Sequence, residues 1–98
     1  MIARHWKGTT KPGDAEHYVA HVRNDTFEKL AGMQGFIEGS IQRRSVDGGI
    51  EFLIETRWQS IESIRQFAGD DPETAVVPPE AQKLLVKFDK FVVHYEMD

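Results

Sequence analysis

The chain has 98 residues and a mass of 11.2 kDa, which is the length of a single domain. It carries 12 Lys and Arg against 16 Asp and Glu and contains no Cys, so a strongly basic surface for nucleic acid, disulfide bonds and cysteine-ligated metal sites are all excluded. Its longest aliphatic or aromatic runs have three residues, far below the roughly 20 that a membrane-spanning helix needs. Because no apolar leader opens the sequence, we expect a soluble, cytoplasmic protein.

The first predicted elements are a strand and a long helix. Residues 2–7 alternate in character and include Trp6, which is typical of a strand, and turn-forming residues follow at 8–13. Over 14–30 the apolar residues recur three or four positions apart, at Ala15, Val19, Val22, Thr26 and Leu30. This period predicts one helix over residues 14–30.

Two strands joined by a hairpin and a second helix come next. Residues 36–46 and 50–58 have the character of strands, and Asp47-Gly48-Gly49 between them favours the positive backbone φ of a tight hairpin turn. Ser60 is a good N-cap for a helix that Gly69 ends. The inner face of this helix holds Ile61, Ile64 and Phe67 or Ala68.

The remainder of the chain predicts a loop, a short helix and a last strand. Residues 70–78 form the loop, Pro79 suits the first turn of a helix that carries Ala81, Leu84 and Leu85, and residues 91–97 form the strand. The order of elements is βαββα(α)β. It predicts a single α+β domain over 1–98 with the ferredoxin-like fold, a four-stranded antiparallel sheet with helices on one face.

Some strand segments are apolar on both faces of the predicted sheet. Phe52-Leu53-Ile54 and Phe91-Val92-Val93 do not alternate, although a sheet with one face in water requires alternation. Two helices cover only one face, and the other would leave an apolar patch on the order of 400 Å² exposed. We therefore predict a homodimer that closes sheet against sheet.

Several local sequences resemble those of one known family. They are Ile2-Ala3-Arg4 with Trp6, Trp58-Gln59-Ser60, Phe67-Ala68-Gly69-Asp70, and Phe88 with His94-Tyr95-Glu96. In this order, along nearly the whole chain, they resemble the antibiotic biosynthesis monooxygenase-like proteins. The resemblance implies a dimeric α/β barrel of ferredoxin-like protomers, each with a small-molecule cavity between its sheet and its helices.

The resemblance also implies an activity, a cofactor-independent monooxygenase that acts on a small planar aromatic or polyketide-like molecule. The anthrone-oxidising members carry an Asn four residues before the Trp of this junction and a Tyr six after it, where this chain has Ile54 and Ile64. The heme-degrading members carry Asn, Trp and His where the nearest residues here are Trp6, Phe67 and Ala75. Two alternatives therefore stay open: a non-catalytic, ligand-binding or stress-associated barrel protein, and, least favoured, a heme-degrading monooxygenase.

Strand parity places a group of candidate substrate-binding residues on one face of the sheet. Arg4 and Trp6 share a face of the first strand, and Thr56 and Trp58 share a face of the strand predicted beside it. In one interpretation the two indoles sandwich a planar ligand and Arg4 binds its anionic oxygen, with Phe67 of the second helix also in contact. In the other, both indoles belong to the core and Arg4 reaches solvent or a carboxylate.

Three histidines are further candidates. His94 is a candidate general base, because the ordinary pKa of histidine is near working pH, and the alternative is a hydrogen-bonded structural residue. His17 and His21 have the four-residue spacing of metal ligands on a helix, but no third ligand accompanies them. We predict that both lie on a solvated face, that Arg43 and Arg44 point to opposite faces of their strand, and that the protein holds neither metal nor cofactor.

Overall fold

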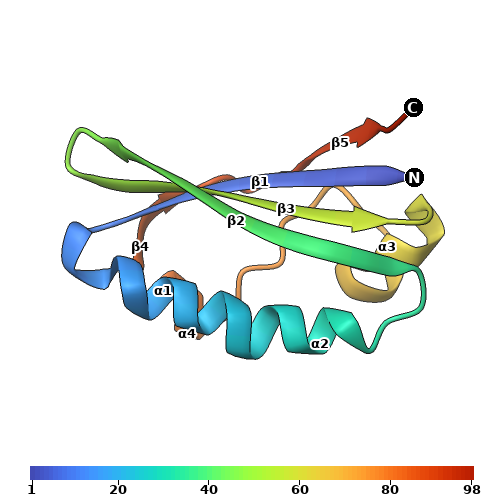
Figure 1. The fold of residues 1–98 in the computed structure, drawn as a ribbon, viewed down its shortest axis with the longest axis horizontal. Coiled ribbons are helices and arrows are strands. Elements are labelled where there is room, and N and C mark those ends of the chain that lie inside the picture. Colours follow the sequence, from blue (N-terminus) through green and yellow to red (C-terminus); the bar gives the residue numbers. More distant parts are fainter.

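The computed structural model describes residues 1–98 as an antiparallel sheet with all helices on one side (Figure 1). The strands are β1 (Ile2–Thr10), β2 (Phe36–Val46), β3 (Gly49–Trp58), β4 (Leu85–Phe88) and β5 (Val93–Glu96). The helices are α1 (Ala15–His21), α2 (Phe27–Ala31), α3 (Ile61–Ala68) and α4 (Pro79–Gln82). The predicted α+β class and ferredoxin-like order are confirmed.

The sheet has five strands, one more than predicted. Its order is β2-β3-β1-β4, and β5 also pairs with β1. β4 pairs with the end of β1 at Gly8 to Thr10, whereas β5 pairs with its beginning at Ile2 to His5, so the two short strands share one edge. The prediction that Leu84 and Leu85 belong to a helix is wrong, because α4 ends at Gln82 and Leu85 pairs with Thr10. This pairing gives hydrogen-bond partners to a sheet edge that would otherwise stay open.

The long N-terminal helix is interrupted in its middle. α1 and α2 are separated by one π-helical turn, Val22–Thr26, and a 3-10 turn at Pro12–Asp14 precedes α1. The prediction of a helix over 14–30 is therefore correct in its bounds to within a residue, but the helix is not α-helical throughout. π-helical turns within α-helices are rare and often lie at functional sites.

Local sequence determines the boundaries of α3 as predicted. The Ser60 side chain accepts a hydrogen bond from the Ser63 backbone N–H at 3.2 Å, and this cap satisfies one of the free donors of the first turn. Gly69 ends the helix with a φ of 83°, a value that only glycine adopts readily. The two ends hold the apolar face of α3 against the sheet, where Ile64 is fully buried.

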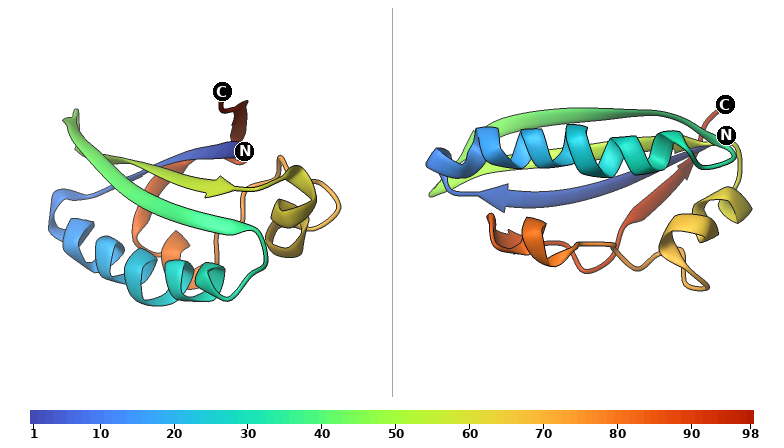
Figure 2. Two further views of the ribbon diagram at one scale, coloured as in Figure 1. Left: turned by 45° about the vertical axis from the view of Figure 1, so that its right-hand side comes forward. Right: turned by 90° about the horizontal axis from the view of Figure 1, so that it is seen from below.

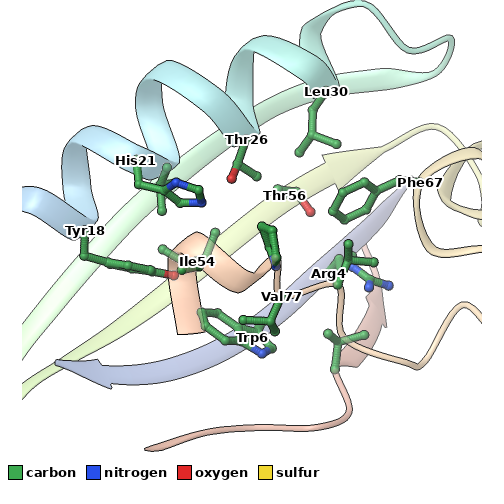
Figure 3. A pocket seen from close by; sticks show the side chains of 15 residues that line it. Arg4, Trp6, Tyr18, His21, Thr26, Leu30, Ile54, Thr56, Phe67 and Val77 are labelled. Atoms are coloured by element: carbon green, nitrogen blue, oxygen red, sulfur yellow. The ribbon is translucent and has the colours of Figure 1, made fainter. Parts of the chain in front are cut away.

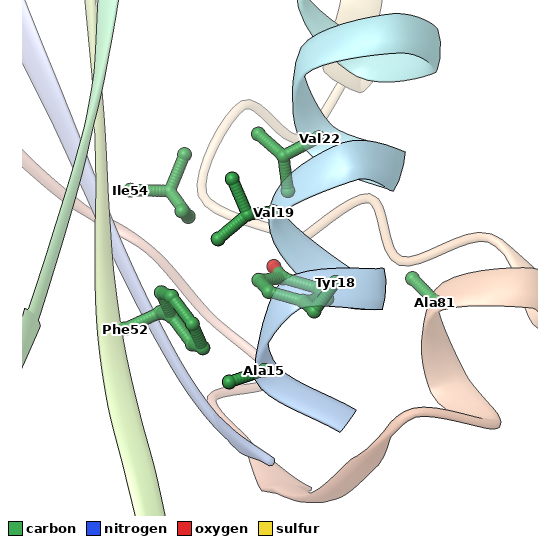
Figure 4. Close-up of a cluster of buried hydrophobic side chains, with 7 residues drawn as sticks. All are labelled: Ala15, Tyr18, Val19, Val22, Phe52, Ile54 and Ala81. Atoms are coloured by element: carbon green, nitrogen blue, oxygen red, sulfur yellow. The ribbon is translucent and has the colours of Figure 1, made fainter. Parts of the chain in front are cut away.

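The core between sheet and helices consists of two clusters of buried side chains. The larger cluster joins α1 to β3 and α4, with Tyr18 against Phe52 at its centre (Figure 4). Its members are Ala15, Tyr18, Val19, Val22, Phe52, Ile54 and Ala81. The smaller cluster, Leu30, Trp58 and Ile64, joins α2 to β3 and α3.

The other face of the sheet has no covering layer of helices (Figure 2). Val93 and Tyr95 of β5 are 52% and 56% exposed there, and they pair with His5 and Ala3 of β1. We call this side of the sheet the open face. Its apolar residues on β5 agree with the sequence pattern from which the homodimer was predicted, while the structure itself describes one chain.

Candidate functional site

A small cavity lies between the sheet and the helices, and residues of both core clusters contribute to its wall (Figure 3). Its volume is about 70 Å³. Its lining residues are Arg4, Trp6, Tyr18, His21, Val22, Thr26, Leu30, Ile54, Thr56, Phe67, Val76, Val77, Pro78, Ala81 and Val92. This volume has room for a few water molecules, so an aromatic ring enters only if part of the wall moves.

The wall that can move most easily is the loop between α3 and α4. Val76, Val77 and Pro78 line the cavity from a segment without regular secondary structure, and Val76 is 43% exposed. The opposite wall belongs to the central strands β1 and β3, whose hydrogen bonds hold it in place. We therefore expect the cavity to open on the side of residues 76–78.

Arg4 is the only charged residue of β1 that points into the cavity. It lies between Thr56 of β3 and His94 of β5 in the sheet register and is 4% exposed. Its Nη1 donates to the Pro72 carbonyl, and its Nη2 donates to the Thr74 carbonyl at 3.0 Å. Burial lowers the pKa of Arg4 to about 10, which still leaves the guanidinium charged at neutral pH.

The charge of Arg4 has no carboxylate partner in the protein. Six ion pairs of Lys or Arg with carboxylates form elsewhere in the chain, together with two contacts between His and a carboxylate, and none of them includes Arg4. Its other close contact is the Phe67 ring, whose centroid lies 5.7 Å from the guanidinium carbon. A buried cation without a counter-ion is costly, and the Nε–H and one Nη2–H take no part in the hydrogen bonds described. The arrangement is therefore suited to an anionic ligand group.

His94 contacts Arg4 and does not line the cavity wall. Its Nε2 lies 3.0 Å from Arg4 Nη1. Because guanidinium can only donate, Nε2 accepts this hydrogen bond and the imidazole proton sits on Nδ1. Burial lowers the pKa of His94, the Arg4 charge lowers it further, and Glu73 opposes the change. The residue is therefore neutral at pH 7.

Trp6 and Phe67 are two of the large aromatic rings that line the same cavity as Arg4, and Trp6 follows Arg4 by two residues on the same face of β1. Trp6 Nε1 donates to the Asp89 carbonyl at 2.8 Å, which fixes the orientation of the indole, and its ring lies 6.3 Å from that of Phe88. Phe67 reaches the cavity from α3, on the side of Arg4 (Figure 3). An aromatic ligand beside Arg4 would contact Phe67, and one that extends along β1 would also contact Trp6.

Thr56 lines the cavity, but Trp58 lies outside it. Trp58 is completely buried in the smaller core cluster, and its indole stacks on Phe67 with the ring centroids 6.4 Å apart. Its Nε1 donates to Thr56 Oγ1 at 2.9 Å, so it holds a residue of the cavity wall. Strand parity correctly places Trp58 on the same face as Arg4, yet its pairing with Ile2 moves it beyond the cavity's end. The two indoles therefore do not face each other across a ligand site.

Two lining residues of α1, Tyr18 and His21, are not among the ligand-binding residues predicted from the sequence. The expectation that His21 lies on a solvated face is wrong: its side chain is 13% exposed, and its Nε2 is buried with no hydrogen-bond partner. His17, one turn earlier, is exposed as predicted. The signal was present in the sequence, because Ala15, Tyr18 and Val22 also recur at helical spacing and residue 21 shares a face with residue 18.

The other predicted features lie on the surface. Arg43 and Arg44 point to opposite faces of β2, as predicted, because Arg43 pairs with Glu16 of α1 and Arg44 pairs with Glu51. No three His, Asp or Glu side chains come together as they would around a metal ion. None of the helices has the length and apolar character required to cross a membrane.

Comparison with known proteins gives structural matches alone. No protein-family profile matches the chain, and no curated protein sequence is similar to it. A conserved protein from Methanosarcina mazei aligns over 99% of this chain and 92% of its own with a TM-score of 0.69 at 17% identity. A protein from Bacillus cereus, named as an antibiotic biosynthesis monooxygenase of presumed activity, aligns over 97% and 89% with a TM-score of 0.61 at 20% identity.

A third structure is the heme-degrader MhuD from Mycobacterium tuberculosis, with two hemes bound in its active site. It aligns over 99% of this chain and 95% of its own, with a TM-score of 0.60 at 14% identity. At these identities the matches establish a shared fold. The resemblance to antibiotic biosynthesis monooxygenase-like proteins is thus confirmed for the fold of nearly the whole chain.

Proposed function

We propose that this protein binds a small planar aromatic anion in the cavity and oxidises it with dioxygen, without a bound metal or cofactor. The observation that carries the proposal is Arg4, a buried cation that has no carboxylate partner and lies beside the Phe67 ring in a cavity that Trp6 also lines. An anionic oxygen of the ligand would supply the missing counter-charge, and guanidinium binds such oxygens through paired donors. Trp6 and Phe67 would orient the ring, and Thr56 would complete the polar wall beside Arg4.

In this proposal His94 takes the proton from a substrate hydroxyl, and the oxyanion that forms is the anion that Arg4 stabilises. A substrate oxygen held by Arg4 would lie next to the imidazole, whose Nε2 is 3.0 Å from Nη1. A neutral His94 can accept a proton once the substrate replaces Arg4 as its partner. The resulting carbanion or phenolate transfers electrons to dioxygen; one oxygen atom enters the product as a carbonyl, and the other leaves as water with the two hydrogens removed from the substrate.

Oxygen uptake with a panel of anthrones and quinols tests this function. We expect His94→Gln to lower kcat by about 100-fold or more, and Arg4→Gln to raise KM as well. Arg43→Gln is the matched control, because Arg43 also lies over a phenylalanine ring, 5.6 Å from Phe52, but outside the cavity. Unchanged turnover in both cavity variants would refute the assigned roles.

A non-catalytic binding protein is the second candidate, and one observation favours it. Ile54 lines the cavity and Ile64 is fully buried, at the two positions where the sequence resemblance implies polar catalytic residues. Isoleucine cannot stabilise an oxyanion by a hydrogen bond. Binding of an aromatic anion that depends on Arg4, without oxygen uptake for any member of the panel, would support this second function.

Heme degradation has the least support. A cavity of about 70 Å³ is far too small for a porphyrin, and the change required at residues 76–78 would be correspondingly large. Titration with hemin decides the question: a shift of the Soret band that saturates at one or two hemes per chain would favour heme, and no shift would exclude it.

We also propose that two copies of the chain associate through the open face. The half-exposed Val93 and Tyr95 support this, because a dimer would remove their apolar surface from water. The mass from light scattering at micromolar concentration tests the proposal. A dimer mass is expected, and a monomer mass would contradict it.

A further inference from the structure

The helix side of the cavity contains a buried polar atom whose role remains unassigned. His21 Nε2 is buried and has no hydrogen-bond partner, in a side chain that is 13% exposed. The nearest acidic group, Asp25 Oδ2, lies 4.0 Å away, beyond hydrogen-bond distance. Buried polar atoms are nearly always paired, and an unpaired one requires an explanation such as strain, a role in catalysis, or a bound water, ion or ligand.

The surroundings of His21 suit a neutral polar group. Tyr18 lies beside it, with the two ring centroids 6.5 Å apart, and burial raises the pKa of Tyr18 well above its usual value, so the phenol stays uncharged. Thr26, the last residue of the π-helical turn, adds a hydroxyl to the same wall. Arg4 belongs to the opposite wall, because it points from the sheet whereas His21 points from the helix layer (Figure 3).

We infer that His21 forms a second polar contact with the ligand, so that the substrate class is a planar aromatic anion carrying a hydroxyl group away from its anionic end. This inference rests on the proposed function, in which Arg4 binds the anion. A hydroxyl can donate to an unprotonated Nε2 and accept from a protonated one, so it satisfies His21 in either state. His21 would then determine specificity, since an analogue without the hydroxyl leaves Nε2 buried and unpaired.

Two matched pairs of ligands test the inference by isothermal titration calorimetry: benzoate with 4-hydroxybenzoate, and 2-naphthoate with 6-hydroxy-2-naphthoate. In the wild-type protein we expect the hydroxyl of at least one pair to tighten binding by about five- to tenfold. In His21→Leu the gain, taken as the ratio of the two affinities measured in the same variant, should fall below about twofold. His21→Gln, which keeps a hydrogen-bonding group, should retain part of the gain.

His17→Leu is the matched control, since the same substitution is made one turn away at an exposed position. It should leave the hydroxyl gain unchanged. An equal gain in His21→Leu and the wild type, or no gain in either pair, would overturn the inference while leaving the proposed function intact. If the parent acids fail to bind, or bind equally well to Arg4→Gln, the proposed function fails and the inference falls with it.

Discussion

The contrast between the two tryptophans gives a quantitative test of where the cavity lies. Trp58 is fully buried and bonded to Thr56, whereas Trp6 is partly buried at the cavity wall. Phenylalanine at position 58 would remove about three buried carbon-sized groups, worth about 2 kcal/mol, and a hydrogen bond worth about 1 kcal/mol. We therefore expect Trp58→Phe to lower the free energy of unfolding by about 3 kcal/mol.

In a domain of this size such a loss corresponds to a fall in Tm of about 12 to 24 °C. The variant should still fold, because domains commonly have 5 to about 15 kcal/mol of stability. Trp6→Phe should cost only about 1 kcal/mol, since its indole is partly exposed already and water can replace its exposed hydrogen bond to the Asp89 carbonyl, but it removes contact area from the ligand. Benzoate should therefore bind Trp6→Phe several-fold more weakly, and Trp58→Phe within about twofold of the wild type.

Urea denaturation with an unchanged m-value measures the stability loss, and calorimetry measures the affinity. If Trp58→Phe lowers the free energy of unfolding by less than about 1 kcal/mol, Trp58 is not the buried core residue described above. A loss of benzoate affinity in Trp58→Phe that equals the loss in Trp6→Phe would place both indoles at the ligand and refute the assignment.

Three further outcomes are expected from single substitutions. Ser60→Ala should destabilise the protein by about 1 kcal/mol in urea denaturation through loss of the α3 cap, and Ser60→Gly by only a few tenths. Burial and Arg4 lower the pKa of His94 in the folded protein, so as the pH falls His94 takes up a proton more readily in the unfolded chain. The free energy of unfolding of the wild type should therefore fall as the pH drops below about 6.5, and His94→Gln should remove this part of the pH dependence. Val93→Lys should convert the proposed dimer to monomer by light scattering, whereas Lys90→Glu, a charge change outside β5, should not.

Much of the fold could be predicted because its signals are local. The helical period between 14 and 30, the glycines of the hairpin and the Ser60 cap each act over a few residues. The division of the last edge into β4 and β5 could not be predicted, because it depends on which part of β1 is free to pair. The residues around Leu85 do not indicate whether it continues α4 by another turn or pairs with β1 as a strand.

The site was predictable only in part, for a related reason. Parity places Arg4, Trp6 and Thr56 on the correct face of the sheet, since side chains alternate along any strand. Position along the strand and the covering helices then decide which residues reach the cavity, and this excludes Trp58 and brings in His21. The contact between Arg4 and His94 depends on the pairing of β1 with β5, which joins residues 90 positions apart.

A crystal structure of the protein with 4-hydroxybenzoate is the most direct measurement of the ligand site. We expect the carboxylate within hydrogen-bond distance of the Arg4 guanidinium, the ring against Trp6 and Phe67, and residues 76–78 displaced outward. A ligand bound elsewhere while the cavity stays closed, or a carboxylate of the protein or of a second copy beside Arg4, would contradict the proposed ligand site.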